Sequence, residues 1–269
     1  MKDDFLAERG IFYRTNAFVP GRQTLVFIHG ISGSLSAWRL YEEHFKNRYN
    51  IVTYDGCGHG KSAKPRSYAR YALPELARDL EALLDHLHVE RCVIVAHSYA
   101  TMVALEFVHA HPERVSRVVL LAPNIGNHAN TLTRLAYPLI LLATWLARLL
   151  PGFGRPGGHI DYTRFPNSGD WNIPRMWADV HNTTLRVYLY WSLQAYAFDA
   201  RPYLGAIRVP VLFMHGMRDT LYPVEHSLMM HERIGGSQLI TLPDMDHILV
   251  LNRFPEVSAA IEDFLEKQK

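Results

Sequence analysis

The sequence predicts an α/β protein whose core is a mostly parallel sheet covered by helices on both faces. Short runs of β-branched and aliphatic residues alternate with helical patterns from residue 25 to 122, and the alternation resumes from residue 211 to the end. Strands that are buried on both faces are apolar throughout, as these runs are. Because each run is followed by a helical pattern, neighbouring strands are expected to run parallel in one sheet.

The first half of the pattern opens with a strand or hairpin over residues 11–18, which ends at the turn residues Pro20-Gly21. Apolar runs then predict strands at 25–28, 51–54, 93–96 and 118–122, and helices are expected at 38–48, 71–87 and from Ser98 to about His111. The helix at 71–87 has a core-facing stripe at three- and four-residue spacing, formed by Leu73, Leu76, Ala77, Leu80, Leu83, Leu84 and Leu87.

Residues 124–202 interrupt the alternation. Residues 135–150 are apolar almost all round, but they are too few for a transmembrane helix, which needs about 20 residues. Residues 170–198 have a helical pattern rich in tyrosine and tryptophan. We interpret this section as an insertion between two core halves, 1–123 and 203–269. The second half predicts strands at 211–214 and 239–242, and helices at 224–234 and 254–267.

Composition excludes several classes of protein. A formal net charge of +2 over 269 residues offers no basic surface for nucleic acid or an anionic membrane. Cys57 and Cys92 are too few for a disulfide framework, which favours reduced thiols and a cytoplasmic location. The acidic start at Asp3 and Asp4 is unlike a signal peptide. The sequence leaves the oligomeric state open.

The turn after the strand at 93–96 carries the first candidate catalytic residue. Ser98 lies where a buried strand gives way directly to a helix, and a serine on such a turn has the placement of a nucleophile elbow. The usual flanking glycines are replaced by Ala96 and Ala100. On this stretch alone, Ser98 could equally be only a small residue in a tight turn.

Two later loops carry partners for this serine. Asp219 and His247 follow the strands predicted at 211–214 and 239–242, and loops after the carboxyl ends of parallel strands form the ligand crevice. A serine needs a base to act as a nucleophile, which His247 can supply, and Asp219 can hold the imidazole in one tautomer. The backbone N–H groups of Ile31 and Tyr99 are expected to bind the oxyanion.

Other residues of the sequence offer alternatives to this reading. The loop from Asp55 to Ser62 nearly reads as a phosphate-binding P-loop, but Asp55 stands where its first glycine is required and Pro65 follows where its helix begins. Asp244 and Asp246 are too close to His247 in sequence to be preferred as the acid.

Together these motifs resemble the α/β-hydrolase superfamily. The resemblance rests on His29-Gly30, Asp55–Ser62, the Ser98 turn, His215–Asp219 and Asp246-His247. It implies a serine hydrolase that needs no metal or other cofactor, with residues 124–202 as a helical lid over the serine. Asn124 stands where some relatives carry the acid, which favours Asp219. An aspartate-dependent dehalogenase or epoxide hydrolase is disfavoured, because Ser98 occupies the nucleophile position.

The substrate class is inferred from the side chains of the lid. The lid's aromatic and aliphatic side chains can pack on the core, line an apolar acyl pocket or open onto a lipid surface, and its charges look scattered. We therefore expect a small-molecule ester with an aliphatic or moderately hydrophobic acyl group. The alternatives that remain are a thioesterase, a lactonase, a carbon–carbon bond hydrolase, a perhydrolase, or a binding protein of this fold without catalysis.

Overall fold

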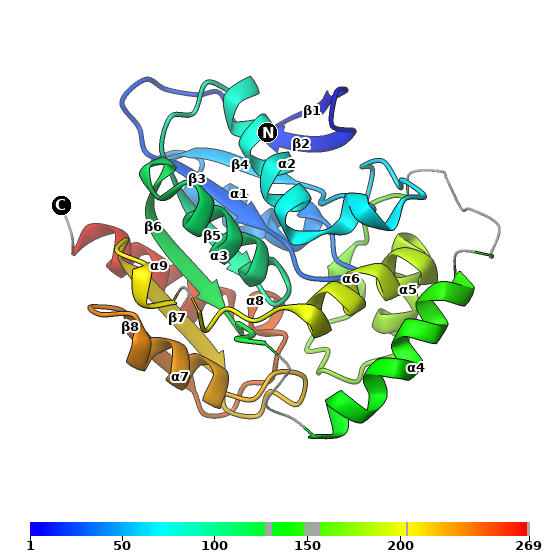
Figure 1. Ribbon diagram of the computed structural model, residues 1–269. Coiled ribbons are helices and arrows are strands. Elements are labelled where there is room, and N and C mark those ends of the chain that lie inside the picture. The colour runs from blue at the N-terminus through cyan, green and yellow to red at the C-terminus, as the bar shows by residue number, and fades with distance from the viewer. Residues whose placement is uncertain (127–130, 148, 150–156, 203, 268–269) are drawn as a thin grey trace.

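The predicted mostly parallel sheet forms the centre of the protein (Figure 1). The computed structural model describes residues 1–126, 131–147, 149, 157–202 and 204–267. Its strands are β1 Lys2–Leu6, β2 Ile11–Thr15, β3 Thr24–Ile28, β4 Asn50–Tyr54, β5 Cys92–His97, β6 Val115–Leu121, β7 Val211–Gly216 and β8 Gln238–Leu242. They lie in the order β1-β2-β4-β3-β5-β6-β7-β8, and β4 through β8 run parallel to β3.

Helices follow most strands, as the alternation predicted. Their bounds are α1 Arg39–Phe45, α2 Leu73–His86, α3 Ala100–Ala110, α4 Thr131–Ala147, α5 Ile173–Thr183, α6 Leu185–Ala197, α7 Glu225–Arg233, α8 Leu249–Asn252 and α9 Phe254–Glu266. Helices α2, α3 and α7 contribute to the core on one face of the sheet, and α1 and α9 contribute to the core on the other.

Strand β5 illustrates why the central strands are apolar on both sides. Cys92, Ile94 and Ala96 belong to the core beneath α2 and α3, whereas Val93 and Val95 belong to the core beneath α1 and α9. All five side chains are fully buried. Because successive residues of a strand point to opposite faces, only a continuous apolar run satisfies both cores.

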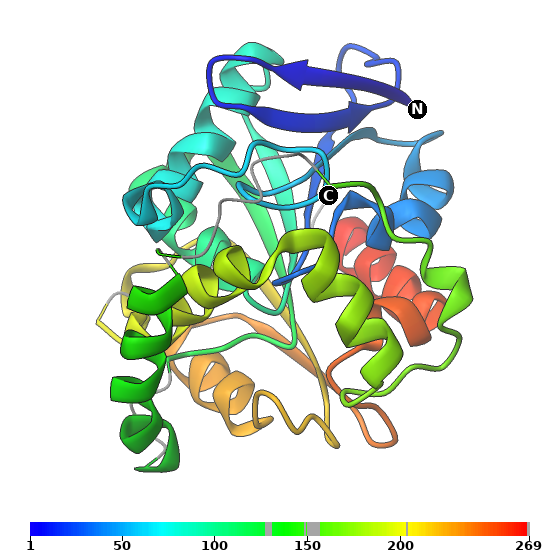
Figure 2. The same cartoon turned by 90° about the vertical axis from the view of Figure 1, so that its right-hand side faces the viewer.

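The N-terminal edge holds a strand, β1, that lies before the strand or hairpin expected at residues 11–18. Strand β1 pairs antiparallel with β2, and the two form the dark blue ribbon at the edge of Figure 2. Residues Lys2 to Phe5 of β1 are exposed, so this strand lacks the apolar alternation by which strands are recognised.

The segment between β6 and β7 supplies α4, α5 and α6 and no strand of the sheet in its described residues. Figure 1 shows these three helices grouped on one side of the sheet, away from α9. Helix α4 begins before the apolar run at residues 135–150 and continues through Pro138, which removes one internal hydrogen bond from the helix. None of the described helices combines the length and the apolar character needed to cross a membrane.

Candidate active site

The tight turn between β5 and α3 holds Ser98. Its φ of +58° lies in the left-handed region, which a residue with a side chain adopts only when its surroundings impose it. Here the Ser98 N–H donates to the carbonyl of Leu121 on β6 at 2.9 Å, and the N–H of Thr101 donates to the Ser98 carbonyl at 2.9 Å. Ser98 is 5% exposed, so its side chain is more enclosed than a residue on an open turn.

The alanines at positions 96 and 100 are accommodated within this turn. Both side chains are fully buried, and α3 begins at Ala100. The closest approach to the turn comes from Gly30 instead, because a Cβ there would lie 3.0 Å from the Ser98 Cβ and 3.3 Å from Nδ1 of His97. The glycine that this site requires for close packing is therefore on the loop after β3.

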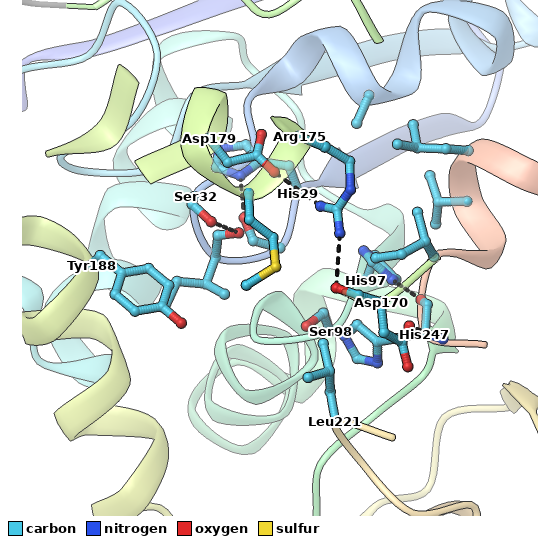
Figure 3. Close-up of a pocket in the computed structure, with 18 of the residues that line it drawn as sticks. His29, Ser32, His97, Ser98, Asp170, Arg175, Asp179, Tyr188, Leu221 and His247 are labelled. Carbon is cyan, nitrogen blue, oxygen red and sulfur yellow. Dashed lines mark hydrogen bonds and ion pairs between the residues drawn. The ribbon is translucent and has the colours of Figure 1, made fainter. Parts of the chain in front are cut away.

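The structure brings Ser98, His247 and Asp219 into one hydrogen-bonded line. Nε2 of His247 lies 2.6 Å from the Ser98 Oγ, and Nδ1 of His247 lies 2.6 Å from Oδ2 of Asp219. Because an ionised carboxylate only accepts, Nδ1 carries the proton, and Nε2 of the neutral ring is free to accept the serine proton. Figure 3 shows His247 and Ser98 side by side at the base of the pocket.

Asp219 is a fully buried carboxylate with both oxygens occupied. Oδ1 accepts the backbone N–H groups of Leu221 and Tyr222, each at 2.8 Å, while Oδ2 accepts from His215 at 3.1 Å and from His247. Burial alone raises the pKa of Asp219, but the hydrogen bonds from His215 and His247 outweigh it and hold the pKa well below its ordinary value. Asp219 is therefore ionised at neutral pH.

His215, which the sequence placed in a loop, ends strand β7 together with Gly216 and is fully buried. Its Nδ1 accepts the Ser227 hydroxyl at 2.6 Å, so its Nε2–H is available to Asp219 and to the Tyr222 carbonyl. A fixed tautomer thus presents a donor to the carboxylate on the side opposite His247.

Asp170 is the residue that sequence reasoning missed. It precedes α5 and is buried, and its Oδ1 accepts the backbone N–H of His247 at 2.8 Å. Its Oδ2 accepts both the N–H and the hydroxyl of Thr220, at 2.9 and 2.7 Å. One carboxylate from the inserted segment therefore fixes the loop of His247 and the residue after Asp219. A lone aspartate between Gly169 and Trp171 carries no sequence pattern that marks this role.

The expected oxyanion donors flank Ser98. Tyr99 directly follows it, and Ile31 follows Gly30, whose backbone lies against Ser98. Among the turn and cap hydrogen bonds of the described residues, neither the Ile31 nor the Tyr99 N–H has a backbone acceptor. An oxyanion site requires N–H groups beside the serine, so Ile31 and Tyr99 remain the predicted donors.

Three further histidines surround the site as neutral groups. His97 donates its Nε2–H to the His247 carbonyl at 2.9 Å, and burial lowers the pKa of His97 to about 3. His29 and His59 each accept a backbone N–H through Nε2, and burial lowers the pKa of both. None of the three places a positive charge beside His247 at neutral pH.

A pocket of about 330 Å³ opens above Ser98 and His247. Its wall is mostly apolar and aromatic, with side chains that include Trp38, Tyr162, Trp171, Met176, Val180, Tyr188, Tyr196, Leu221, Tyr222, Ile248, Val250 and Leu251. Helices α5 and α6 supply much of this wall.

The expectation that the charges of the insertion are scattered is wrong for the pocket wall. Arg175 and Asp179, one turn apart on α5, form a buried ion pair there at 2.9 Å (Figure 3). The Tyr162 hydroxyl donates to Asp179 at 3.0 Å. Burial raises the pKa of Asp179 to about 6 despite its arginine partner. The helical spacing of four residues identifies the pair, but its burial comes only from the fold.

The loop that resembles a P-loop has a different use. The Asp55 carboxylate accepts the backbone N–H groups of Leu35 and Lys61 at 2.9 and 2.8 Å, and His159 of the insertion approaches it at 2.8 Å. A Cβ at Gly60, which has a φ of +45°, would collide with this carboxylate. The Asp55 carboxylate therefore occupies the Lys61 N–H, a donor of the loop that a bound phosphate would need.

The other candidate acids lie elsewhere. Asp244 forms an exposed ion pair with Arg218, and Asp246 accepts the backbone N–H of Ile248. Asn124 is buried beyond β6 and caps its own loop. No three His, Cys, Asp or Glu side chains are grouped to hold a metal ion in the part of the chain that the structure describes.

Known proteins resemble this chain over most of its length. Protein ABHD8 of Bos taurus is 28% identical over 250 residues, which are 90% of this chain and 55% of that protein. The uncharacterized protein Rv2715 of Mycobacterium tuberculosis is 30% identical over 234 residues, which are 80% of this chain and 67% of that protein. The chain thus spans about half the length of the ABHD8 proteins that it matches.

Solved structures agree with the architecture. The crystal structure of MGS-M2, an α/β hydrolase enzyme from a Medee basin deep-sea metagenome library, superposes with a TM-score of 0.77 at 21% identity and covers 96% of this chain and 95% of that one. The family model described as the alpha/beta hydrolase fold matches residues 23–254. That match includes β3 through β8 and all three members of the hydrogen-bonded line, and the protein therefore belongs to the α/β-hydrolase fold family.

Proposed function

We propose that this protein is a serine hydrolase that cleaves carboxylic esters through an acyl-enzyme, with Ser98 as nucleophile, His247 as base and Asp219 as the acid that orients it. The observation that carries the proposal is the line of two 2.6 Å contacts from the Ser98 Oγ through His247 to Asp219, at the wall of a largely apolar pocket. Geometry of this kind is what nucleophilic catalysis by serine requires.

The first half of the reaction forms the acyl-enzyme. Nε2 of His247 takes the proton of Ser98 while Oγ attacks the ester carbon, which creates a tetrahedral oxyanion. The N–H groups of Ile31 and Tyr99 bind that oxyanion, and each donor contributes roughly 3–4 kcal/mol to the transition state. His247 then returns the proton to the departing alcohol, and the acyl group remains on Ser98.

Water completes the cycle. His247 removes a proton from water, the hydroxyl attacks the acyl carbon, and Oγ of Ser98 leaves with the proton from His247. Each step passes through an imidazolium at His247, which the ionised Asp219 stabilises. The neutral state of His97 supports this scheme, because a second positive charge there would oppose the imidazolium.

The inserted segment, residues 124–202, acts in this proposal as a lid that shapes the acyl pocket. Its helices α5 and α6 contribute Met176, Val180, Tyr188 and Tyr196 to the wall. These side chains support an aliphatic or moderately hydrophobic acyl group as the substrate class. A pocket of about 330 Å³ suits a substrate of modest size.

Replacing Ser98 with alanine should abolish labelling by a fluorophosphonate probe and reduce ester hydrolysis to the uncatalysed rate, because the attacking oxygen is removed. Labelling is measured on wild type and Ser98→Ala side by side, with circular dichroism to check folding. Absence of labelling in folded wild type would contradict an activated serine and favour a binding protein without catalysis.

Asp219→Asn should lower kcat by about four orders of magnitude, since an amide cannot hold the tautomer of His247 that accepts the serine proton. Asp244→Asn is the matched control, because Asp244 lies near His247 in sequence but is an exposed carboxylate paired with Arg218, so it should stay close to wild type. Steady-state kinetics on one activated ester compares the two variants. Near-wild-type turnover by Asp219→Asn would remove Asp219 from the mechanism.

Asp170→Asn should lower kcat by up to about a hundredfold with a smaller effect on KM. Both oxygens of Asp170 accept N–H groups, so the NH2 of an asparagine side chain would face a donor and displace the His247 loop. The control is Asp161→Asn, an exposed carboxylate of the same segment. Kinetics and thermal unfolding are measured together. Equal kinetic losses in the two variants would show that Asp170 does not position His247.

A series of p-nitrophenyl esters should show kcat/KM rising from acetyl to medium-chain acyl groups, by up to about threefold to fourfold for each methylene that the pocket buries. The series runs from acetyl through hexanoyl to dodecanoyl, with a benzoyl ester for comparison. Rates for acetyl or benzoyl esters far above those for hexanoyl and longer esters would rule out the apolar acyl pocket.

A further inference from the structure

Helix α4 exposes large apolar side chains along one face. Leu139, Leu141, Leu142, Trp145 and Leu146 of α4, and Leu149 just after it, are each between 42% and 70% exposed. Figures 1 and 2 both place α4 at the outer edge of the molecule. A contiguous apolar surface of this kind on a folded protein marks a contact with something else.

The exposed face is distinct from the side of α4 that packs on the protein. Leu142, Trp145, Leu146 and Leu149 recur at three- and four-residue spacing, so they share one face of the helix. Thr144 is 2% exposed and lies on another face, and α4 packs against α6. The apolar residues therefore remain exposed after α4 has made its contacts with the described protein.

The charge of the sequence around α4 indicates what kind of surface it contacts. Residues 124–160 contain Arg134, Arg148 and Arg155 and no aspartate or glutamate. The rest of the chain has 25 basic and 26 acidic side chains, so its formal charge is −1. The positive charge of the protein is thus concentrated in the segment that carries the exposed apolar face.

We propose that α4 is a docking surface for an anionic phospholipid bilayer and lies in the plane of the headgroup region. Leucine side chains insert shallowly beside the acyl chains, a tryptophan suits the interface, and arginines are attracted to anionic headgroups. The net charge of +2 offered no basic surface for an anionic membrane, because it hides a local charge of +3 in residues 124–160.

Docking through α4 would bring the pocket close to the bilayer. Helix α6, on which α4 packs, contributes Tyr188 and Tyr196 to the pocket wall. Hydrophobic esters dissolved in the membrane would then lie near the entrance. The membrane contact itself does not depend on the proposed hydrolysis, because it involves none of the residues around Ser98.

A second copy of the chain is the other occupant that could cover this face. Burying leucine against leucine in a dimer requires no excess of arginine, and two identical segments of charge +3 would repel each other. The combination of exposed leucines, a tryptophan and unbalanced arginines fits an anionic membrane better than a symmetric interface.

The test measures co-sedimentation of the full chain with vesicles of phosphatidylcholine alone and of equal parts phosphatidylcholine and phosphatidylglycerol. Wild type should bind the anionic vesicles at least tenfold more tightly than the neutral ones, and binding should weaken as salt is added. The variant Leu142→Gln/Trp145→Gln/Leu146→Gln should lose at least tenfold in affinity. These side chains are already exposed, so the variant should fold, which circular dichroism checks.

The matched control carries the same change at three exposed apolar residues on other elements, Phe5→Gln/Leu40→Gln/Leu228→Gln, and should bind as wild type does. Failure of wild type to bind anionic vesicles overturns the proposal, as does an equal loss in the control. Sedimentation velocity measures the oligomeric state of wild type and of the α4 variant. A wild-type dimer that the variant disrupts would assign this face to a second copy and overturn the proposal. Ester hydrolysis by Ser98 is assayed separately, so failure of either proposal leaves the other testable.

Discussion

The buried carboxylate of Asp219 is the interaction on which the site depends. Taking a charge out of water costs several kcal/mol, and the cost is offset only when hydrogen bonds satisfy the group. Here two backbone N–H groups and two histidines do so, and they come from β7, from the loop beyond it and from the loop that follows β8. The same bonds that keep Asp219 ionised therefore fix the orientation of His247 toward Ser98.

A second set of carboxylates joins the insertion to the core. Asp170 of the insertion accepts hydrogen bonds from the loops of His247 and Asp219, and Asp55 of the core receives His159 of the insertion. Each is a buried group whose partners lie on separate segments. Movement of the inserted helices would expose or unpair these carboxylates, so the proposed lid and the proposed catalytic loops are energetically coupled.

The insertion has two surfaces of different character. Toward the core, α5 and α6 line the pocket with aromatic and aliphatic side chains and one buried ion pair, Arg175 with Asp179. Away from the core, α4 leaves its leucines and Trp145 exposed. The apolar side chains of the insertion therefore differ in their surroundings from one helix to the next: those of α5 and α6 line the pocket, and those of α4 are exposed. Which side chains are covered depends on how the helices pack.

The sequence by itself determined the order of strands and helices, the family, and Ser98, Asp219 and His247 as candidates. Period-2 and period-3.6 patterns are local, and the motifs follow strands whose carboxyl ends share one edge of the sheet. Only the tertiary structure decided that β1 pairs with β2, that Asp170 holds the His247 backbone, and that Arg175 and Asp179 face the pocket. These features depend on contacts between segments that are distant in sequence. A single exposed strand or a lone aspartate has no periodic pattern, so the sequence alone does not reveal such contacts.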